Sequence, residues 1–160
     1  MPDALPSLSA TDSASDDSPV ARKRPKPGER RVQILQALAE MLEQPGADRI
    51  TTAALAARLS VSEAALYRHF ASKAQMFEGL IEFVEQSVFT LVNQITERPL
   101  SAASHEAGAG KRQAAQIVAM VLQFAERNPG MTRVMVGDAL VFENARLQQR
   151  MNQFFDKIEA

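Results

Sequence analysis

Apolar residues recur at helical spacing through most of the chain, from Glu29 to the last residues. No segment of useful length alternates with the period of two that a half-buried strand needs. In the longest periodic segment, apolar residues follow one another at intervals of 4, 3, 4, 3 and 4 residues. They are Phe77, Ile81, Val84, Val88, Leu91 and Ile95. The sequence therefore predicts an all-α fold.

Start and stop signals bound the predicted helices. Hydroxyl residues that can cap a helix stand before the second, third and fourth of them, and Pro or Gly follows the first and the fifth. The predicted ranges are 29–43, 53–59, 63–70, 72–97 and 113–125. The fifth contains the apolar run 117–122 and is expected to be largely buried. One or two further helices are expected to follow it, the last running to the end of the chain.

The capping residues are specific. Thr51 and Thr52 supply hydroxyls for the second helix and Ser62 for the third, while Ser72 and Gln75 have the spacing of a capping box that starts the long helix. Only about three residues separate the second and third helices, so a tight turn must join them.

This pair has the pattern of a helix-turn-helix. Leu55, Leu59, Val61 and Leu66 lie where two steeply crossing helices share a small core, next to the small residue Ala56. The turn position favours glycine because it often needs a positive φ, and Ser60 would adopt that geometry at a cost of about 1 kcal/mol. An ordinary helical hairpin within a bundle is the alternative.

The second helix of the motif has an inward face and an outward face. Leu66 and Phe70 are expected inside, which turns Glu63, Ala64, Tyr67 and Arg68 outward. The hydroxyls of Thr51 and Tyr67 could donate to phosphates, and Lys73 with the free amides at the start of the long helix could bind an anion. His69 either faces DNA or lies at the edge of the core. Glu63 either accepts from a cytosine or favours the helix dipole.

Charge is unevenly distributed. The net charge is −1, but residues 1–21 carry −4, residues 22–73 carry +5 and residues 74–160 carry −2. The basic excess therefore coincides with the helix-turn-helix, as DNA binding requires. Residues 1–27 are rich in Ser, Asp and Pro and are expected to be a disordered tail. Its basic end is either a solvated tail or an arm that contacts DNA, formed by Arg22, Lys23, Arg24 and Lys26.

Several function classes are disfavoured. The chain has no cysteine, and its two histidines, His69 and His105, are far apart, so neither thiolate chemistry nor a histidine metal centre is expected. Neither a secretory signal nor a membrane-spanning run is present. Residues 108–111 lack the pattern of a phosphate-binding loop, and no motif of an enzyme or cofactor site is found.

Residues 65–73, which close a three-helix module ahead of a long helix, resemble the TetR family of dimeric bacterial regulators. Residues 49–53, 61–67, 82–83, 126–130, 142–148 and 152–153 resemble the nucleoid occlusion branch of that family. The resemblance implies a homodimer that binds palindromic sites in double-stranded DNA on the nucleoid, in the cytoplasm. It also implies binding to the C-terminal tail of the division protein FtsZ, which prevents ring assembly and cell division over the nucleoid.

The resemblance also implies site residues. DNA contacts would fall on Thr51, Thr52, Ser62, Ala64, Tyr67, His69 and Lys73. An FtsZ groove between the long helix and the next one would contain Phe83, Met120, Arg127 and Asn128. Three of them also fit plainer roles, Phe83 and Met120 as core residues and Arg127 as a charge that complements the dipole at a helix C-terminus.

The expected organisation is a tail over residues 1–27, a DNA-binding domain over 28–75 and a partial dimerisation or regulatory domain over 76–160. Family members usually have further C-terminal dimerisation helices, so the sequence predicts a truncated form. A small-molecule-responsive repressor is the alternative function. It would need a cavity with polar anchors in the second domain, whereas the nucleoid occlusion function predicts a filled core and a surface groove.

Overall fold

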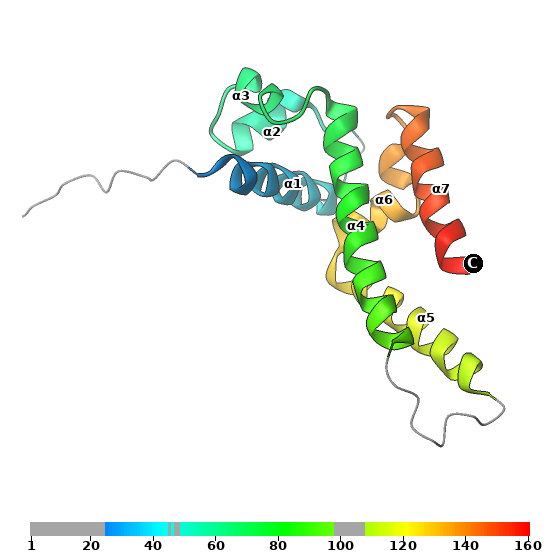
Figure 1. Cartoon of the computed structure of the whole chain (residues 1–160). Coiled ribbons are helices and arrows are strands. Elements are labelled where there is room, and N and C mark those ends of the chain that lie inside the picture. Colours follow the sequence, from blue (N-terminus) through cyan, green and yellow to red (C-terminus); the bar gives the residue numbers. More distant parts are fainter. Residues whose placement is uncertain (1–24, 45, 47–48, 98–107) are drawn as a thin grey trace, which may run out of the picture.

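The computed structural model describes residues 25–44, 46, 49–97 and 108–160. Within these ranges the chain forms α-helices and one short 3-10 helix, with no strand, so the all-α prediction is confirmed (Figure 1). The elements are α1 (Pro27–Glu43), α2 (Thr52–Arg58), α3 (Glu63–Tyr67), α4 (Lys73–Thr96), α5 (Ala109–Arg127), α6 (Pro129–Met135), η2 (Asp138–Leu140) and α7 (Ala145–Glu159). No helix in the described ranges is long and apolar enough to cross a membrane.

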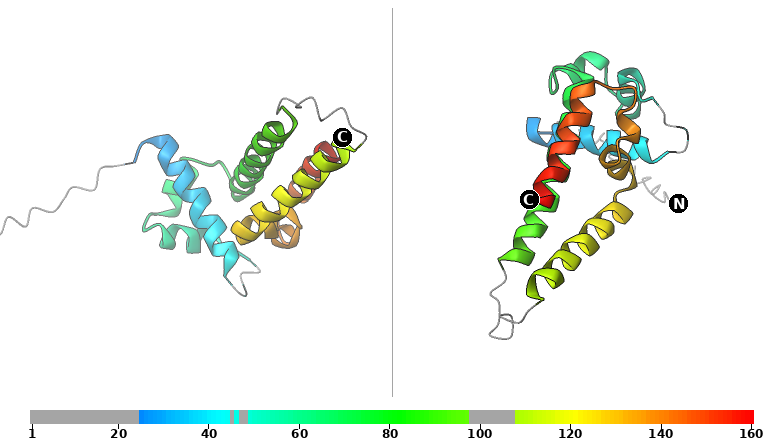
Figure 2. Two further views of the ribbon diagram at one scale, coloured as in Figure 1. Left: turned by 90° about the horizontal axis from the view of Figure 1, so that it is seen from below. Right: turned by 90° about the vertical axis from the view of Figure 1, so that its right-hand side faces the viewer.

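The helix α4 is the centre of the molecule. It contacts α1, α5, α6 and α7, and α5 runs alongside its C-terminal part (Figure 2). The buried residues form one cluster that runs from Ile34 in α1 to Phe154 in α7. The helix-turn-helix and the later helices therefore share one hydrophobic core.

Among the first four helices, two boundaries differ from the prediction by more than one residue. Helix α1 begins two residues early, because Pro27 is tolerated in a first turn and the Glu29 carboxylate accepts from the Lys26 N–H at 3.1 Å. Helix α3 ends at Tyr67 instead of continuing to Phe70. The amides of His69 and Phe70 still bond to the Leu66 carbonyl, so the chain tightens into a turn there.

The expectation that the fifth helix is largely buried is wrong. Helix α5 is longer than predicted and has no fully buried residue, and Val118 and Leu122 are 59% and 60% exposed. The six consecutive apolar residues encircle the helix, while only the side that carries Met120, Val121 and Phe124 packs against the core. An apolar run without a helical period therefore did not indicate burial.

Helix α6 crosses α1 at very close range. A Cβ on Gly130 would lie 2.1 Å from the Ala39 carbonyl oxygen. Arg133 strengthens the crossing, since its Nη1 donates to the Leu42 carbonyl oxygen at 3.0 Å. The sequence places Gly130 in a helix stop. The preceding helix does end before Asn128, but Gly130 itself lies in α6 and is needed there for its lack of a side chain.

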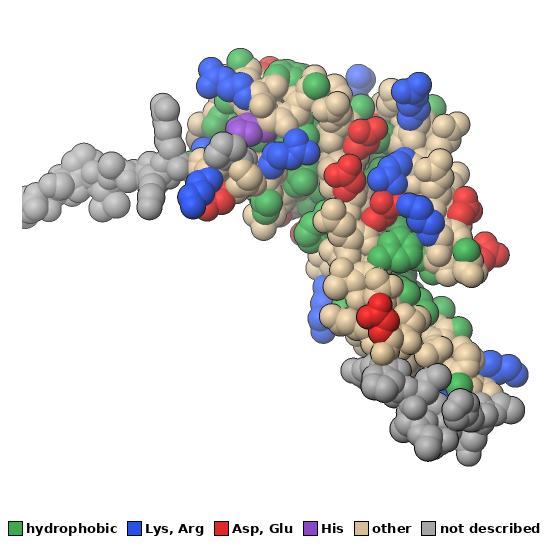
Figure 3. Space-filling view, in the orientation of Figure 1, with side chains coloured by type: hydrophobic (Ala, Val, Ile, Leu, Met, Phe, Trp, Pro, Cys, Tyr) green, Lys and Arg blue, Asp and Glu red, His purple; other side chains and the backbone are tan. Residues whose placement is uncertain are grey.

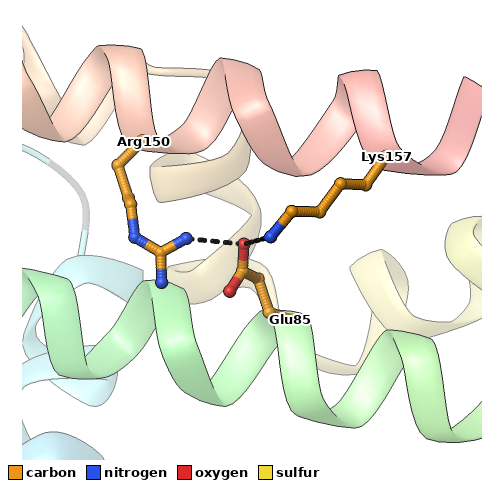
Figure 4. A network of polar contacts seen from close by, with 3 residues as sticks. All are labelled: Glu85, Arg150 and Lys157. Carbon is orange, nitrogen blue, oxygen red and sulfur yellow. Dashed lines mark hydrogen bonds and ion pairs between the residues drawn. The ribbon is translucent and has the colours of Figure 1, made fainter.

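Ion pairs join α4 to α7. The Glu85 carboxylate accepts from Arg150 at 2.7 Å and from Lys157 at 3.4 Å (Figure 4). Burial acts to raise the pKa of Glu85, but the hydrogen bond from Arg150 and the charges of Arg150 and Lys157 outweigh it and lower that pKa below its ordinary value. In Figure 3 acidic side chains lie along α4 beside basic side chains of α7.

Candidate nucleic-acid interface

Two hydroxyl caps place the short helices of the motif. Thr51 Oγ1 accepts from the Ala54 amide at 3.1 Å and Ser62 Oγ accepts from the Ala65 amide at 3.2 Å. Both caps agree with the prediction. Thr52 does not cap its helix, because it is already the first helical residue.

The turn between α2 and α3 has the geometry of a helix-turn-helix. Ser60 adopts a φ of 55°, the left-handed conformation that the motif demands. The side chains of Leu55 and Leu66 are buried beneath the turn, with Leu59 and Val61 packed against them. The predicted small core is therefore present, and a non-glycine residue occupies its strained position.

The outward face of α3 carries a chain of polar contacts. Glu63, Ala64, Tyr67 and Arg68 are all exposed, as predicted. Thr52 Oγ1 donates to Glu63 Oε2 at 2.8 Å, and the Tyr67 hydroxyl, 3.5 Å from Thr52 Oγ1, completes the chain. The Tyr67 side chain is 46% exposed, so its hydroxyl can still reach a ligand on this face.

Glu63 has a partner that the sequence did not suggest. Its carboxylate accepts a hydrogen bond from the Thr52 hydroxyl and lies in the first turn of α3, where the helix dipole favours an acid. The hydrogen bond joins α2 to α3, and the dipole interaction stabilises α3 itself. A structural role for Glu63 is thus visible in the structure, and a base contact is not needed to explain it.

His69 and the residues around it form one edge of this face. His69 is half-buried, and its carbonyl oxygen accepts from Arg31 Nη1 at 2.8 Å. A hollow next to it is lined by Arg30, Arg68 and His69. Figure 3 shows Lys and Arg side chains over the end of the molecule formed by α1 to α3.

Lys73 has an ion-pair partner far along the chain. Its Nζ lies 2.6 Å from Glu143 Oε1, and it is also 5.9 Å from the centre of the Phe77 ring. The sequence assigns Lys73 to an anion site with the first amides of α4. In the structure one of these amides, that of Gln75, already donates a hydrogen bond to Ser72 Oγ at 3.2 Å. The Gln75 side chain accepts from the Ala71 N–H.

Of the predicted basic arm, Arg22, Lys23 and Arg24 lie outside the described residues. Lys26 is exposed and immediately precedes α1, with its backbone amide bonded to Glu29. It is therefore anchored to the first helix at its backbone, and only its side chain is free to contact a ligand.

The four residues of the second predicted site occupy different positions around α4, α5 and α6. Phe83 is 47% exposed on α4, Met120 is half-buried on α5, and Arg127 is exposed in the last turn of α5. Asn128 joins α5 to α6 and donates to the Phe124 carbonyl oxygen at 2.8 Å. It also lines a hollow beside α1, together with Glu40, Glu43 and Met131.

Comparisons with known proteins agree with this geometry. The family model "Bacterial regulatory proteins, tetR family" matches residues 34–80, and "Tetracyclin repressor-like, C-terminal domain", of the SlmA-like type, matches residues 112–160. Together the two matched segments cover more than half of the chain. The chain belongs to the TetR family.

Several curated proteins are similar to this chain and share one name. The chain is 57% identical over 136 residues to "Nucleoid occlusion factor SlmA" of Aliivibrio fischeri (strain MJ11), covering 84% of this chain and 65% of the relative. It is 54% and 53% identical over 131 residues to the proteins of that name from Photobacterium profundum and Vibrio cholerae, each covering 81% of this chain and 63% of the relative. The chain thus spans less than two thirds of the length of these relatives.

The TetR-family segment 34–80 includes all seven predicted DNA contacts. Met120, Arg127 and Asn128 lie in the SlmA-like segment, and Phe83 lies between the two. Two residues that support the TetR-type motif, Arg31 and Glu143, were missed by the sequence reasoning. Their partners lie 38 and 70 positions away in the chain, and no local spacing connects such residues.

Proposed function

We propose that this chain binds double-stranded DNA sequence-specifically through α2 and α3 and acts as a nucleoid occlusion factor. Bound at palindromic chromosomal sites, it inhibits assembly of the FtsZ ring and so prevents division over the nucleoid, in the cytoplasm. The observation that carries this proposal is the high identity to curated SlmA proteins, combined with the TetR-family match over the helix-turn-helix.

The proposed DNA contacts divide by chemistry. Hydroxyls of Thr51 and Tyr67 and the ammonium of Lys73 suit phosphate oxygens, which fix the position of the protein on the duplex. The small side chain of Ala64 allows α3 to approach the base edges in the major groove. The full set is Thr51, Thr52, Ser62, Ala64, Tyr67, His69 and Lys73.

Charge supports the same face. The excess of +5 falls in residues 22–73, the part of the sequence that contains α2 and α3, and phosphate neutralisation is the main source of affinity for DNA. We include Arg22, Lys23, Arg24 and Lys26 as an arm that adds phosphate or minor-groove contacts. The division at residues 27 and 75 into tail, DNA-binding domain and regulatory domain remains part of the proposal.

The proposed protein partners are a second copy of this chain and the C-terminal tail of FtsZ. A two-fold symmetric dimer matches a palindromic site, because each copy reads one half-site. For the FtsZ tail we propose a surface that contains Phe83, Met120, Arg127 and Asn128. The exposed aromatic ring of Phe83 and the exposed charge of Arg127 support this choice.

The alternative of a small-molecule-responsive repressor receives no support from the interior. Across residues 25–44, 46, 49–97 and 108–160, no polar or charged residue is buried. The fully buried interior of this part of the chain is therefore apolar, whereas a small-molecule site needs a few precisely placed polar groups.

Sedimentation of polymerised FtsZ in the presence of the full chain tests the function. DNA sites are first selected from random duplexes by the chain itself. With the selected duplex present, the chain should lower the amount of sedimented FtsZ, and with a scrambled duplex the effect should be much smaller. An effect that does not depend on DNA, or no effect, would contradict the proposal.

Two controls sharpen this experiment. FtsZ without its C-terminal tail should sediment normally under all conditions. The variant Arg127→Ala should lose the effect on FtsZ while keeping DNA affinity, whereas Arg146→Ala, which removes an exposed arginine of α7, should behave as the unmodified chain. Equal behaviour of the two variants would remove Arg127 from the proposed surface.

A further inference from the structure

The ion pair between Lys73 and Glu143 joins two parts of the chain that the proposed function treats separately. Lys73 is the first residue of α4, six positions after the end of α3. Glu143 lies between η2 and α7, where its amide bonds to the Leu140 carbonyl oxygen at 3.0 Å. The side chains of Lys73 and Glu143 are only 24% and 10% exposed.

Shielding makes this contact stronger than a typical surface pair. Water screens exposed ion pairs well, but the carboxylate of Glu143 is nearly covered, and the ammonium of Lys73 sits 2.6 Å from it. The charge of Lys73 is thus compensated within the protein. A phosphate that approached the same ammonium would also meet the negative charge of Glu143 at close range.

We propose that Glu143 is a positioning residue that limits the phosphate contact of Lys73, so that DNA and the segment before α7 compete for one ammonium group. This rests on the proposed DNA binding. DNA that engages Lys73 would weaken its hold on Glu143, and a change that draws Glu143 away would strengthen DNA binding by the same factor, because coupling between two binding events is reciprocal.

The test compares Glu143→Gln with the unmodified chain in binding to a synthetic duplex of random sequence over a series of salt concentrations. Glutamine keeps the shape and an acceptor oxygen but removes the charge. The dissociation constant should fall about three- to tenfold at low salt, with the gain shrinking as salt is added. The slope of log affinity against log salt should steepen by up to about one.

A matched variant separates this local effect from net charge. Glu159→Gln removes an exposed carboxylate at the far end of α7 (Figure 1) and changes the net charge equally. It should change the dissociation constant by less than about twofold, since the screened field of a distant charge is weak. If Glu143→Gln binds no more tightly than Glu159→Gln, the inference is overturned.

A double-mutant cycle assigns the effect to the pair. In a Lys73→Gln background, Glu143→Gln should no longer tighten binding, because the ammonium for which the two anions compete is gone. The same gain in both backgrounds would overturn the inference. Glu143→Asp, which keeps the charge, should stay within about twofold of the unmodified chain, and a gain as large as that of Glu143→Gln would also overturn it.

The stability and the DNA affinity of each variant are measured separately. Thermal unfolding of each variant shows whether the fold is kept, and affinities are compared only between variants that unfold cooperatively. If the unmodified chain binds neither a random nor a selected duplex at low salt, the proposed function fails. If it binds DNA but Glu143→Gln changes nothing, only the role of Glu143 fails.

Discussion

The guanidinium carbon of Arg31 lies 4.2 Å from the centre of the Phe70 ring, while Nη1 of the same group donates to the His69 carbonyl oxygen at 2.8 Å. One side chain of α1 therefore stacks on a core aromatic ring and donates to a carbonyl just after the end of α3. Arginine suits both tasks because its planar group can stack and donate at once.

Replacing Arg31 by lysine keeps the charge but loses this combination. We expect Arg31→Lys to lower the free energy of unfolding by about 1 kcal/mol. Denaturation by urea measures it. Arg30→Lys is the matched control, since Arg30 borders the adjacent hollow, and it should change stability by less than about 0.5 kcal/mol. Equal losses in both variants would show that the Phe70 stack contributes nothing.

Ser60 adopts an unfavourable backbone conformation at the turn between α2 and α3. Its φ of 55° is open to glycine without strain, so Ser60→Gly should raise the free energy of unfolding by about 0.5 kcal/mol, after the greater flexibility of glycine in the unfolded chain is deducted. Calorimetry should show a higher melting temperature. Ser60→Val should lower it, because a β-branched residue is disfavoured at positive φ. The reverse order would contradict the strain.

Gly130 is required by the contact of α6 with α1. Gly130→Ala should lower the free energy of unfolding by at least about 2 kcal/mol, because a backbone carbonyl occupies the space of the new methyl group. Gly110→Ala makes the same change inside α5, where a Cβ meets nothing within 4 Å, and should raise stability by about 0.5 kcal/mol. Thermal unfolding of both variants measures these changes, and equal effects of the two substitutions would contradict the prediction.

The lowered pKa of Glu85 makes part of the stability depend on pH. In the folded chain Glu85 holds its proton less tightly than in the unfolded chain, so its contribution is complete above the ordinary value of 4.5 and is lost as the pH falls through the lower folded-state pKa. Glu85→Gln should lower stability at neutral pH by about 1 kcal/mol and flatten its acid dependence. Urea denaturation from neutral to acidic pH measures both.

The exposed glutamate Glu126 on α5 provides the comparison for Glu85. Glu126→Gln removes one carboxylate without breaking the contact between α4 and α7, so it should follow the acid dependence of the unmodified chain. A Glu85→Gln curve that is parallel to the unmodified one would mean that Arg150 and Lys157 do not favour the ionised carboxylate.

Tyr67→Phe tests the proposed phosphate contact on α3. The side chain is exposed, and the hydrogen bond from its hydroxyl to Thr52 Oγ1 is long at 3.5 Å, so removal of the hydroxyl should leave the fold intact. Affinity should fall about three- to tenfold for random and selected duplexes alike, since phosphates carry no sequence information. Thr90→Val removes an exposed hydroxyl of α4 and should have no effect. Loss of binding to the selected duplex alone would assign Tyr67 to base reading instead.

The parts of the fold that follow from local chemistry were predictable. Caps at Thr51, Ser62 and Ser72 act between residues three apart, and the left-handed turn at Ser60 follows from the spacing of the two short helices. These rules also place Glu63, Ala64 and Tyr67 on the outer face of α3. Position along a short helix was enough to predict which of these side chains are exposed, whereas their role in DNA binding stays a prediction.

The rest depends on neighbours that are remote in sequence. The apolar run on α5 does not reveal that only one side of the helix meets the core. Nothing near Lys73 indicates that its ammonium is already paired with Glu143. Such contacts follow from how the helices cross, and the crossing is decided by packing across the whole core.

The close crossing of α6 over α1 also affects when the first helices can complete their folding during synthesis. Near its C-terminal end, α1 accepts a hydrogen bond from Arg133, 91 positions after Leu42, and it packs closely against Gly130. On the ribosome, the unit formed by α1, α2 and α3 therefore cannot complete its core until α6 has emerged. If the unit of α1, α2 and α3 is transferred to another protein, α6 should be included, because a boundary within α4 would remove the helix that packs against α1.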